Sequence, residues 1–214
     1  MSQALTEQAV VHIVDDDESL RYTLCRLMKS VGLQAKAYGT VSEFIDERSH
    51  EGLGCLVLDV RLPGISGIEF QSQLNGLGIF LPVVLMTGHG DIPMSVRAMK
   101  AGAVDFLPKP FRDQDMLDAV VSAIERDRER RASLGQAVDI FGRFSKLTPR
   151  EQEVMMITTT GKMNKQTAAE LGISEVTVKL HRRAAMQKME ARNLPDLVRM
   201  ADIVRPLINV STGE

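Results

Sequence analysis

Four side chains able to handle a phosphoryl group stand at the ends of apolar segments of this chain. Asp15 and Asp16 close one apolar run, Asp59 closes a second, and Lys109 follows a third. In a parallel sheet with crossover helices, ligands bind beyond the carboxyl ends of the strands. The three carboxylates and the ammonium group are therefore expected to share one site.

Carboxylates gathered in this way repel one another unless a cation lies between them. Mg²⁺ suits such a cluster, because it binds few carboxylates, keeps several waters and completes its shell with phosphate oxygens. Asp59 is the best candidate nucleophile, since it stands alone at the end of its strand, and its attack on a phosphoryl donor gives an aspartyl phosphate. Thr87 could donate its hydroxyl to a phosphoryl oxygen, and Lys109 could place its ammonium against the same group.

The first half of the chain alternates apolar runs with helical patterns, in the rhythm of a βα repeat. Strands are predicted near residues 10–14, 34–38, 55–59, 82–87 and 105–107, with helices starting near Ser19, Val41, Gly67, Asp91 and Arg112. Gly32 and Gly102 fall where helices should end. Five strands and five helices make an open, doubly wound parallel α/β domain, and right-handed crossovers leave helices on both faces of its sheet.

Length and composition limit the alternatives. A chain of 214 residues suggests one large domain or two small ones. No apolar run approaches the roughly 20 residues of a membrane-spanning helix, and the N-terminus does not resemble a signal peptide, so we expect a cytoplasmic protein outside the membrane. Cys25 and Cys55 have no metal-ligand spacing and are expected to be reduced core residues.

Charge divides the chain. Up to Ser145 there are 15 Lys and Arg against 20 Asp and Glu, and from Lys146 onward 11 against 8. The acidic half suits a divalent cation and the basic half a polyanion. Residues 125–145 are predicted to be a helical linker, with Gly135 and Gly142 as flexible points. It would join one domain at residues 1–124 to another at residues 146–214.

The second half predicts an all-α domain of four helices. Thr148-Pro149-Arg150-Glu151 is a capping box with proline at the first helical position. Asn164 opens a short helix, Gly172 lies in a turn, and Ser174 can cap a third helix. A helix, a glycine-containing turn and a second helix form the helix-turn-helix unit. The third helix has two different faces. The apolar face carries Val178, Ala185, Met186 and Met189, and the polar face carries Lys179, Arg183 and Gln187.

Residues 10–124 resemble the receiver domain of two-component response regulators. The resemblance is carried by Ile13-Val14-Asp15-Asp16-Asp17-Glu18, Leu58-Asp59-Val60-Arg61-Leu62-Pro63-Gly64, Met86-Thr87-Gly88-His89-Gly90-Asp91 and Phe106-Leu107-Pro108-Lys109-Pro110-Phe111. It implies a flavodoxin-like fold and that Asp59 is the phosphoacceptor. Asp15, Asp16, Asp59 and the backbone carbonyl of Arg61 would hold Mg²⁺, and Lys109-Pro110 would be a cis peptide.

The same resemblance implies a switch pair. A hydroxyl residue, here Thr87, moves toward the phosphoryl group, and an aromatic residue, here Phe106, fills the vacated space. Because Phe106 lacks the hydroxyl of a tyrosine, a purely steric switch is expected. Arg61 and His89 stand at positions that tune how fast water removes the phosphoryl group in this family.

Residues 144–207 resemble the LuxR/NarL-type effector domain. The matching segments are Leu147-Thr148-Pro149-Arg150-Glu151 and Leu171-Gly172-Ile173-Ser174-Glu175-Val176-Thr177-Val178-Lys179. The resemblance places Lys179, Leu180 and Arg183 near base edges in the major groove. Thr177, His181 and Arg182 would lie nearer phosphates, and Lys165 would be a further DNA contact. Thr167 departs from the family pattern, which has an isoleucine there.

The whole chain resembles the FixJ/StyR branch of response regulators. This implies that a sensor histidine kinase phosphorylates Asp59 and that homodimers form through the face of the fourth helix and fifth strand. The dimer would read an inverted repeat in double-stranded promoter DNA and activate transcription through RNA polymerase. The receiver would catalyse only its own phosphorylation and dephosphorylation.

Two alternatives stay open. An Asp-nucleophile phosphotransferase also uses carboxylates, Thr and Lys around Mg²⁺, but it needs a general acid two residues after the nucleophile, where Arg61 stands. A phosphorylation-independent DNA-binding regulator would use its receiver only to dimerise. The intact acidic cluster argues against the second alternative.

Overall fold

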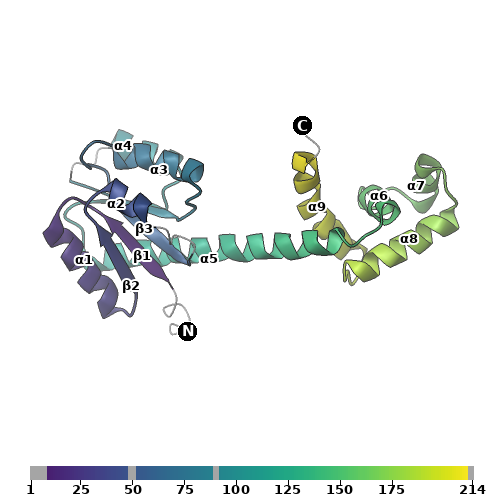
Figure 1. Cartoon of the computed structure of the whole chain (residues 1–214), viewed down its shortest axis with the longest axis horizontal. Coiled ribbons are helices and arrows are strands. Elements are labelled where there is room, and N and C mark those ends of the chain that lie inside the picture. Colours follow the sequence, from purple (N-terminus) through teal and green to yellow (C-terminus); the bar gives the residue numbers. More distant parts are fainter. Residues whose placement is uncertain (1–8, 48–51, 89–91, 212–214) are drawn as a thin grey trace. The chain divides into compact units, whose positions relative to one another are not determined.

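The computed structural model of the chain describes residues 9–47, 52–88 and 92–211. The chain divides into two compact units, Met1–Arg130 and Arg131–Glu214. The first combines a sheet with helices and the second is helical (Figure 1). Within the described ranges, no helix combines the length and apolar character needed to cross a membrane.

The first unit is built on a five-stranded parallel sheet. Its strands are β1 (Val10–Val14), β2 (Gln34–Tyr38), β3 (Gly54–Asp59), β4 (Val83–Thr87) and β5 (Asp105–Pro108). Their order is β2-β1-β3-β4-β5, which confirms the flavodoxin-like prediction. Central strand β3 is buried along its whole length, because helices cover both of its faces, and this explains its uninterrupted apolar run.

Helices cover the sheet on both sides. Helices α1 (Glu18–Ser30) and α5 (Asp113–Phe144) pack on one face, while α2 (Val41–Asp46), α3 (Gly67–Gln73) and α4 (Ile92–Lys100) pack on the other (Figure 1). A short 3-10 helix, Leu74–Leu77, follows α3. Successive right-handed crossovers produce this arrangement. The strand order reverses between β1 and β3, which brings the carboxyl ends of these two strands side by side.

Local signals set the helix ends as the sequence predicts. The Asp17 side chain accepts hydrogen bonds from the backbone N–H groups of Ser19 and Leu20, which caps α1. Gly32 and Gly102 have φ angles of 80° and 92°, a left-handed conformation that glycine adopts without steric cost after a helix. These turns deliver the chain to β2 and β5 respectively.

Helix α5 differs from the prediction in one respect. It continues without interruption from Asp113 to Phe144, so Gly135 and Gly142 lie inside a helix rather than at flexible points. A glycine inside a helix costs only about 1 kcal/mol relative to alanine. Burial of Ile124 near the start and of Ile140 and Phe144 near the end outweighs that cost.

The second unit packs four further helices against the end of α5. They are α6 (Pro149–Thr158), α7 (Asn164–Leu171), α8 (Glu175–Lys188) and α9 (Leu194–Ser211). The capping box forms, with Thr148 and Glu151 each bonding the backbone of the other. The main core consists of apolar side chains from α5, α6, α8 and α9 and the segment before α6, namely Ile140, Phe144, Leu147, Met155, Ala185, Met189, Leu197, Ala201 and Val204.

Both cysteines are free thiols. Cys55 is buried in β3, and this burial raises the pKa of its thiol to about 12, so it stays protonated and inert at neutral pH. Cys25 is half-buried on α1. These positions agree with the prediction of reduced core residues.

Candidate functional site

Three carboxylates meet at the switch point of the sheet. Val14 and Leu58 are partners in the β1–β3 register, so the residues that follow them emerge at the same edge. One carboxylate oxygen from each of Asp15, Asp16 and Asp59 lies within 4.8 Å of the others. Asp15 and Asp59 are buried and Asp16 is exposed, which leaves one side of the cluster open to solvent.

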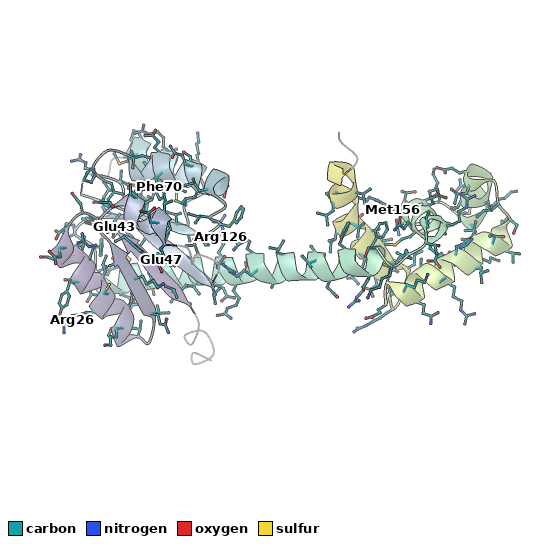
Figure 2. All side chains as sticks on the ribbon, viewed as in Figure 1. Arg26, Glu43, Glu47, Phe70, Arg126 and Met156 are labelled. Atoms are coloured by element: carbon teal, nitrogen blue, oxygen red, sulfur yellow. The ribbon has the colours of Figure 1, made fainter. Side chains whose placement is uncertain are left out.

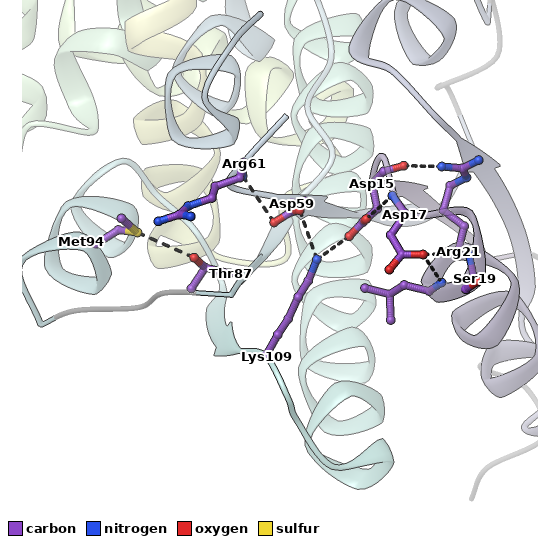
Figure 3. A network of polar contacts seen from close by, with 10 residues as sticks. Asp15, Asp17, Ser19, Arg21, Asp59, Arg61, Thr87, Met94 and Lys109 are labelled. Atoms are coloured by element: carbon purple, nitrogen blue, oxygen red, sulfur yellow. Dashed lines mark hydrogen bonds and ion pairs between the residues drawn. The ribbon is translucent and has the colours of Figure 1, made fainter. Parts of the chain in front are cut away.

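Lys109 reaches this cluster from the segment that follows β5. Its Nζ lies 2.6 Å from Asp15 Oδ2 and 3.1 Å from Asp59 Oδ2 (Figure 3). Its backbone N–H donates a 2.6 Å hydrogen bond to the carbonyl oxygen of Thr87. The Lys109-Pro110 peptide bond is cis, as the family resemblance implies.

Within this cluster, the negative charge of Asp59 is poorly compensated. Burial raises the pKa of Asp59, Lys109 acts against that shift, and the negative charge of Asp15 adds to it. Burial acts to lower the pKa of Lys109, but its pairing with Asp15 and Asp59 outweighs burial and raises that pKa. One ammonium thus serves two buried carboxylates, which leaves a deficit of positive charge.

The donor set fits a hard divalent cation. Carboxylate oxygens at one sheet edge are the ligands that Mg²⁺ prefers, and the exposed Asp16 gives access for water and a phosphoryl group. Arg61 follows the cluster at the start of the β3–α3 loop, and its backbone N–H donates a 3.3 Å hydrogen bond to Asp59 Oδ1. The Arg61 side chain is exposed.

The N-cap of α1 and a residue in its first turn hold Asp15 in place. The backbone N–H of Asp17 donates a 2.9 Å hydrogen bond to Asp15 Oδ1. Arg21 donates from Nη1 to the Asp15 carbonyl oxygen at 2.7 Å (Figure 3). Sequence reasoning did not find Arg21. Its position, six residues after Asp15 and one turn into a helix that starts at the site, is the only signal that points to it.

The expected switch residues lie on the neighbouring strands β4 and β5. Thr87 is buried at the end of β4, and its Oγ1 donates to Met94 Sδ of α4 at 3.9 Å (Figure 3). Phe106 is half-buried on β5, pairs in register with Leu85, and packs against the core that contains α2, α3 and α4. Met94 was missed by sequence reasoning. His89 lies outside the described residues.

The second candidate site is the helix-turn-helix of α7 and α8. Gly172 ends α7 with a φ of 65°, and Ser174 caps α8 by accepting a hydrogen bond from the Thr177 N–H. Val178 and Ala185 of α8, and Met189 directly after its last residue, are fully buried. This confirms the predicted apolar face and leaves the other side of α8 to solvent.

The candidate DNA-contacting residues divide by exposure. Lys165, Lys179, Leu180 and Arg183 are exposed, whereas Thr177, His181 and Arg182 are half-buried. Arg182 donates from Nη1 to Asn164 Oδ1 at 3.0 Å, a bond that links α8 to the first residue of α7. Val176, in the first turn of α8, is also exposed, and it was not among the residues predicted to contact DNA. Side chains across both units are drawn in Figure 2.

Thr167 is accommodated where the family pattern has isoleucine. Its side chain is fully buried in α7, and its Oγ1 donates a 3.2 Å hydrogen bond to the Met163 carbonyl oxygen. A buried hydroxyl that makes such a bond escapes most of the cost of burial. The substitution therefore leaves α7 intact.

The fold and the two sites define a class of protein in which an acidic pocket bridged by a lysine is joined to a helix-turn-helix domain. Residues 11–121 match the response regulator receiver domain, and residues 145–201 match the bacterial regulatory proteins of the luxR family.

Several relatives match over most of the chain. Nodulation protein W of Bradyrhizobium diazoefficiens is 53% identical over 195 residues, covering 91% of this chain and 86% of that protein. The low-resolution structure of response regulator StyR has 48% identity and a TM-score of 0.75, with 91% of this chain and 98% of that chain covered. Full-length FixJ from B. japonicum has 38% identity and a TM-score of 0.56, with 94% and 98% covered.

The chain therefore belongs to the two-component response regulators that join a receiver domain to a LuxR-type helix-turn-helix domain. This family consists of transcription regulators and not enzymes. The receiver implies a sensor kinase as partner, and the LuxR-type domain implies DNA binding.

Proposed function

We propose that this response regulator is phosphorylated on Asp59 by a sensor histidine kinase, dimerises, and activates transcription from inverted-repeat sites. The observation that carries the proposal is the buried pair of Asp15 and Asp59 bridged by Lys109. An acidic residue that only ends a strand in contact with solvent needs no such bridge. A carboxylate that must accept a phosphoryl group does, because negative charge accumulates on the transferred oxygens.

In the proposed transfer an Asp59 Oδ attacks phosphorus. The O–P bond forms as the N–P bond to the kinase histidine breaks, and the electron pair of that bond returns to the imidazole nitrogen. The Lys109 ammonium, already 3.1 Å from Asp59, then pairs with a phosphoryl oxygen. Asp15, Asp16, Asp59 and the Arg61 carbonyl would hold Mg²⁺, which supplies further charge neutralisation when bound.

The proposed output begins at Thr87. Its hydroxyl leaves Met94 and donates to a phosphoryl oxygen, and the Phe106 ring moves into the vacated space. Arg61 and His89 would tune the rate at which water removes the phosphoryl group. The change repositions α4, whose exposed Val96 then forms part of a dimer face with β5.

The dimer presents two copies of α8 to DNA. Half-sites about one helical turn apart, roughly 34–36 Å, are expected for a paired helix-turn-helix. Lys179, Leu180 and Arg183 would read base edges, because these side chains are exposed along α8. A second group would contact the backbone and fix the orientation of α8, namely Lys165, Thr177, His181 and Arg182. The bound dimer would contact RNA polymerase.

A genomic-fragment binding selection tests the proposal. Purified protein is offered DNA fragments in Mg²⁺ alone and in Mg²⁺ plus beryllofluoride, which mimics the aspartyl phosphate. Enrichment of an inverted repeat only with beryllofluoride is expected, and Asp59→Asn should abolish that difference. Enrichment that is equal in both conditions would instead support the phosphorylation-independent regulator. Absence of enrichment in either would overturn the proposed activation.

A further inference from the structure

The part of α5 in the second unit carries an apolar surface that its own domain leaves exposed. Leu134, Val138 and Phe141 are 58%, 65% and 38% exposed, and they recur at intervals of four and three residues. We call these three residues the linker stripe. Ile140 and Phe144 lie on a different face of the helix, where they are buried in the core of the second unit.

Two glycines flank the linker stripe, and the fold of the single chain does not explain them. A Cβ atom built on Gly135 or Gly142 meets nothing within 4 Å. Both have the helical conformation, so alanine would fit and would stabilise the helix. Glycine is useful where another backbone must approach closely. Seven residues separate the two glycines, so both adjoin the stripe on the same side.

We propose that the linker stripe pairs with the linker stripe of a second copy of this chain when the receivers dimerise. Spacing of four and three residues is that of a coiled-coil seam, in which a helix packs against an identical helix. The flanking positions Gly135, Ala137 and Gly142 carry no charge, so two copies meet without repulsion beside the seam. The contact is self-complementary, as a twofold dimer requires.

The size of the linker stripe explains why this pairing depends on the receiver. Three side chains per helix bury far less than the roughly 1,200 Å² of a stable protein interface. The stripe cannot hold two free chains together. Once receivers pair, the linkers meet at an effective concentration in the range of about millimolar, and a weak seam then closes. The inference thus rests on the proposed phosphorylation-dependent dimer, and it assigns α5 the task of bringing two DNA-binding domains into register.

Disulfide trapping of the full-length chain tests the pairing. Val138→Cys places a thiol in the linker stripe, and Gln136→Cys places one on the opposite side of the same helix, also exposed. The unsubstituted chain, which keeps Cys25 and Cys55, reports background cross-linking. With beryllofluoride and a mild oxidant, Val138→Cys should form covalent dimers at least about tenfold faster than without beryllofluoride, because pairing raises the local thiol concentration. Gln136→Cys should show no such increase.

The mass of each sample, measured by sedimentation, separates the possible failures. A chain that dimerises with beryllofluoride while Val138→Cys and Gln136→Cys cross-link equally would overturn the linker pairing and leave the proposed function standing. A chain that stays monomeric would overturn the proposed dimerisation and the pairing with it. A Val138→Cys thiol that is alkylated slowly both without and with beryllofluoride, and that forms no covalent dimer, would show that the chain's own receiver covers the stripe, which overturns the pairing.

The glycines provide a second test. Gly135→Ala combined with Gly142→Ala should raise the melting temperature of the inactive chain, because alanine favours the helix. The same variant should slow activated cross-linking through Val138→Cys several-fold, because the added methyl groups keep the helices apart. A faster reaction, or an unchanged one, would contradict close helix approach.

Discussion

At the scale of single residues, the buried carboxylates of the acidic site carry more negative charge than Lys109 compensates. Asp15 and Asp59 are buried together, and Lys109 is the cation that contacts both. Burial keeps the pKa of Asp59 raised in spite of Lys109. A second cation should therefore bind favourably, and its binding should stabilise the folded receiver, because the unfolded chain does not assemble these carboxylates.

Asp15→Asn tests this linkage. Mg²⁺ at 100 times its dissociation constant should stabilise the unsubstituted receiver by about 2.7 kcal/mol, and Asp15→Asn should lose most of that increment because it removes a buried anionic ligand. The measurement is the rise in melting temperature on adding Mg²⁺, compared within each variant. Asp17→Asn is the control, since asparagine also caps helices and Asp17 stands outside the cluster. An equal rise in both variants would contradict the assignment.

Met94 provides a second test at this scale. Its sulfur accepts the Thr87 hydroxyl bond at 3.9 Å and so competes with a phosphoryl oxygen for that hydroxyl. Met94→Leu preserves volume but removes the acceptor, which is a weak one. Phosphorylation by acetyl phosphate should become faster, by up to about fivefold. In a Thr87→Val background the same substitution should change nothing, and any remaining effect would mean that Met94 acts elsewhere.

At the scale of elements, one ion pair joins α6 to α8, the second helix of the helix-turn-helix. Glu151 belongs to the capping box of α6, and Lys188 at the end of α8 contacts it at 2.6 Å. Burial acts to raise the pKa of Glu151, but the bonds from Lys188 and Thr148 outweigh burial and lower that pKa. The orientation of α8 thus depends on an ionised carboxylate.

Glu151→Gln should lower stability in a pH-dependent way. The folded-state pKa of Glu151 lies below its unfolded value, so its stabilisation is complete above the unfolded pKa and disappears as pH falls through the folded pKa. Glutamine keeps the capping bond, so the loss at neutral pH is that of the charged bond to Lys188, about 1 kcal/mol.

Thermal unfolding followed by circular dichroism at several pH values measures this effect. The difference between Glu151→Gln and the unsubstituted chain should shrink as the solution is acidified. Glu153→Gln is the matched control, since Glu153 pairs with Arg150 on the exposed side of α6. Exposed pairs contribute little, so Glu153→Gln should change stability by less than about 0.5 kcal/mol. A difference for Glu151→Gln that stays constant across pH would exclude an ionic contribution.

At the scale of the whole molecule, the proposed function requires two copies of the chain to bind DNA as a dimer. The candidate receiver face on α4 carries exposed apolar residues at intervals of four and three, namely Ile92, Val96 and Met99. Linking two DNA-binding domains through paired receivers raises operator affinity without any new DNA contact.

Val96→Asp should separate phosphorylation from DNA binding. The side chain is exposed in the single chain, so folding and phosphorylation by acetyl phosphate should stay unchanged. Two buried carboxylates in the dimer face would repel, so activated operator affinity should fall by about a hundredfold. Tyr22→Asp, at a position on α1 that is 66% exposed against 45% for Val96, should have no such effect. Normal operator binding by monomeric Val96→Asp would contradict the requirement for a dimer.

The amino-acid sequence alone determined the elements and the centre of the acidic site. Apolar runs specified the strands, Asp17 and Thr148 specified helix starts, and the rules of parallel sheets brought Asp15 and Asp59 together. These signals are local in the chain, or follow from topology that few alternatives satisfy. The face of α8 left for DNA followed from helical periodicity in the same way.

Only the tertiary structure decided which side chains contact the site residues and which contacts join one helix to another. Arg21 bonds the Asp15 carbonyl, Met94 accepts from Thr87, and Lys188 meets a carboxylate 37 residues away. Such contacts depend on helix placement and on side-chain rotamers, which no local pattern encodes. The structure also decided that α5 stays helical at Gly135. The burial of apolar α5 side chains before and after this glycine outweighs the small cost of a glycine inside a helix.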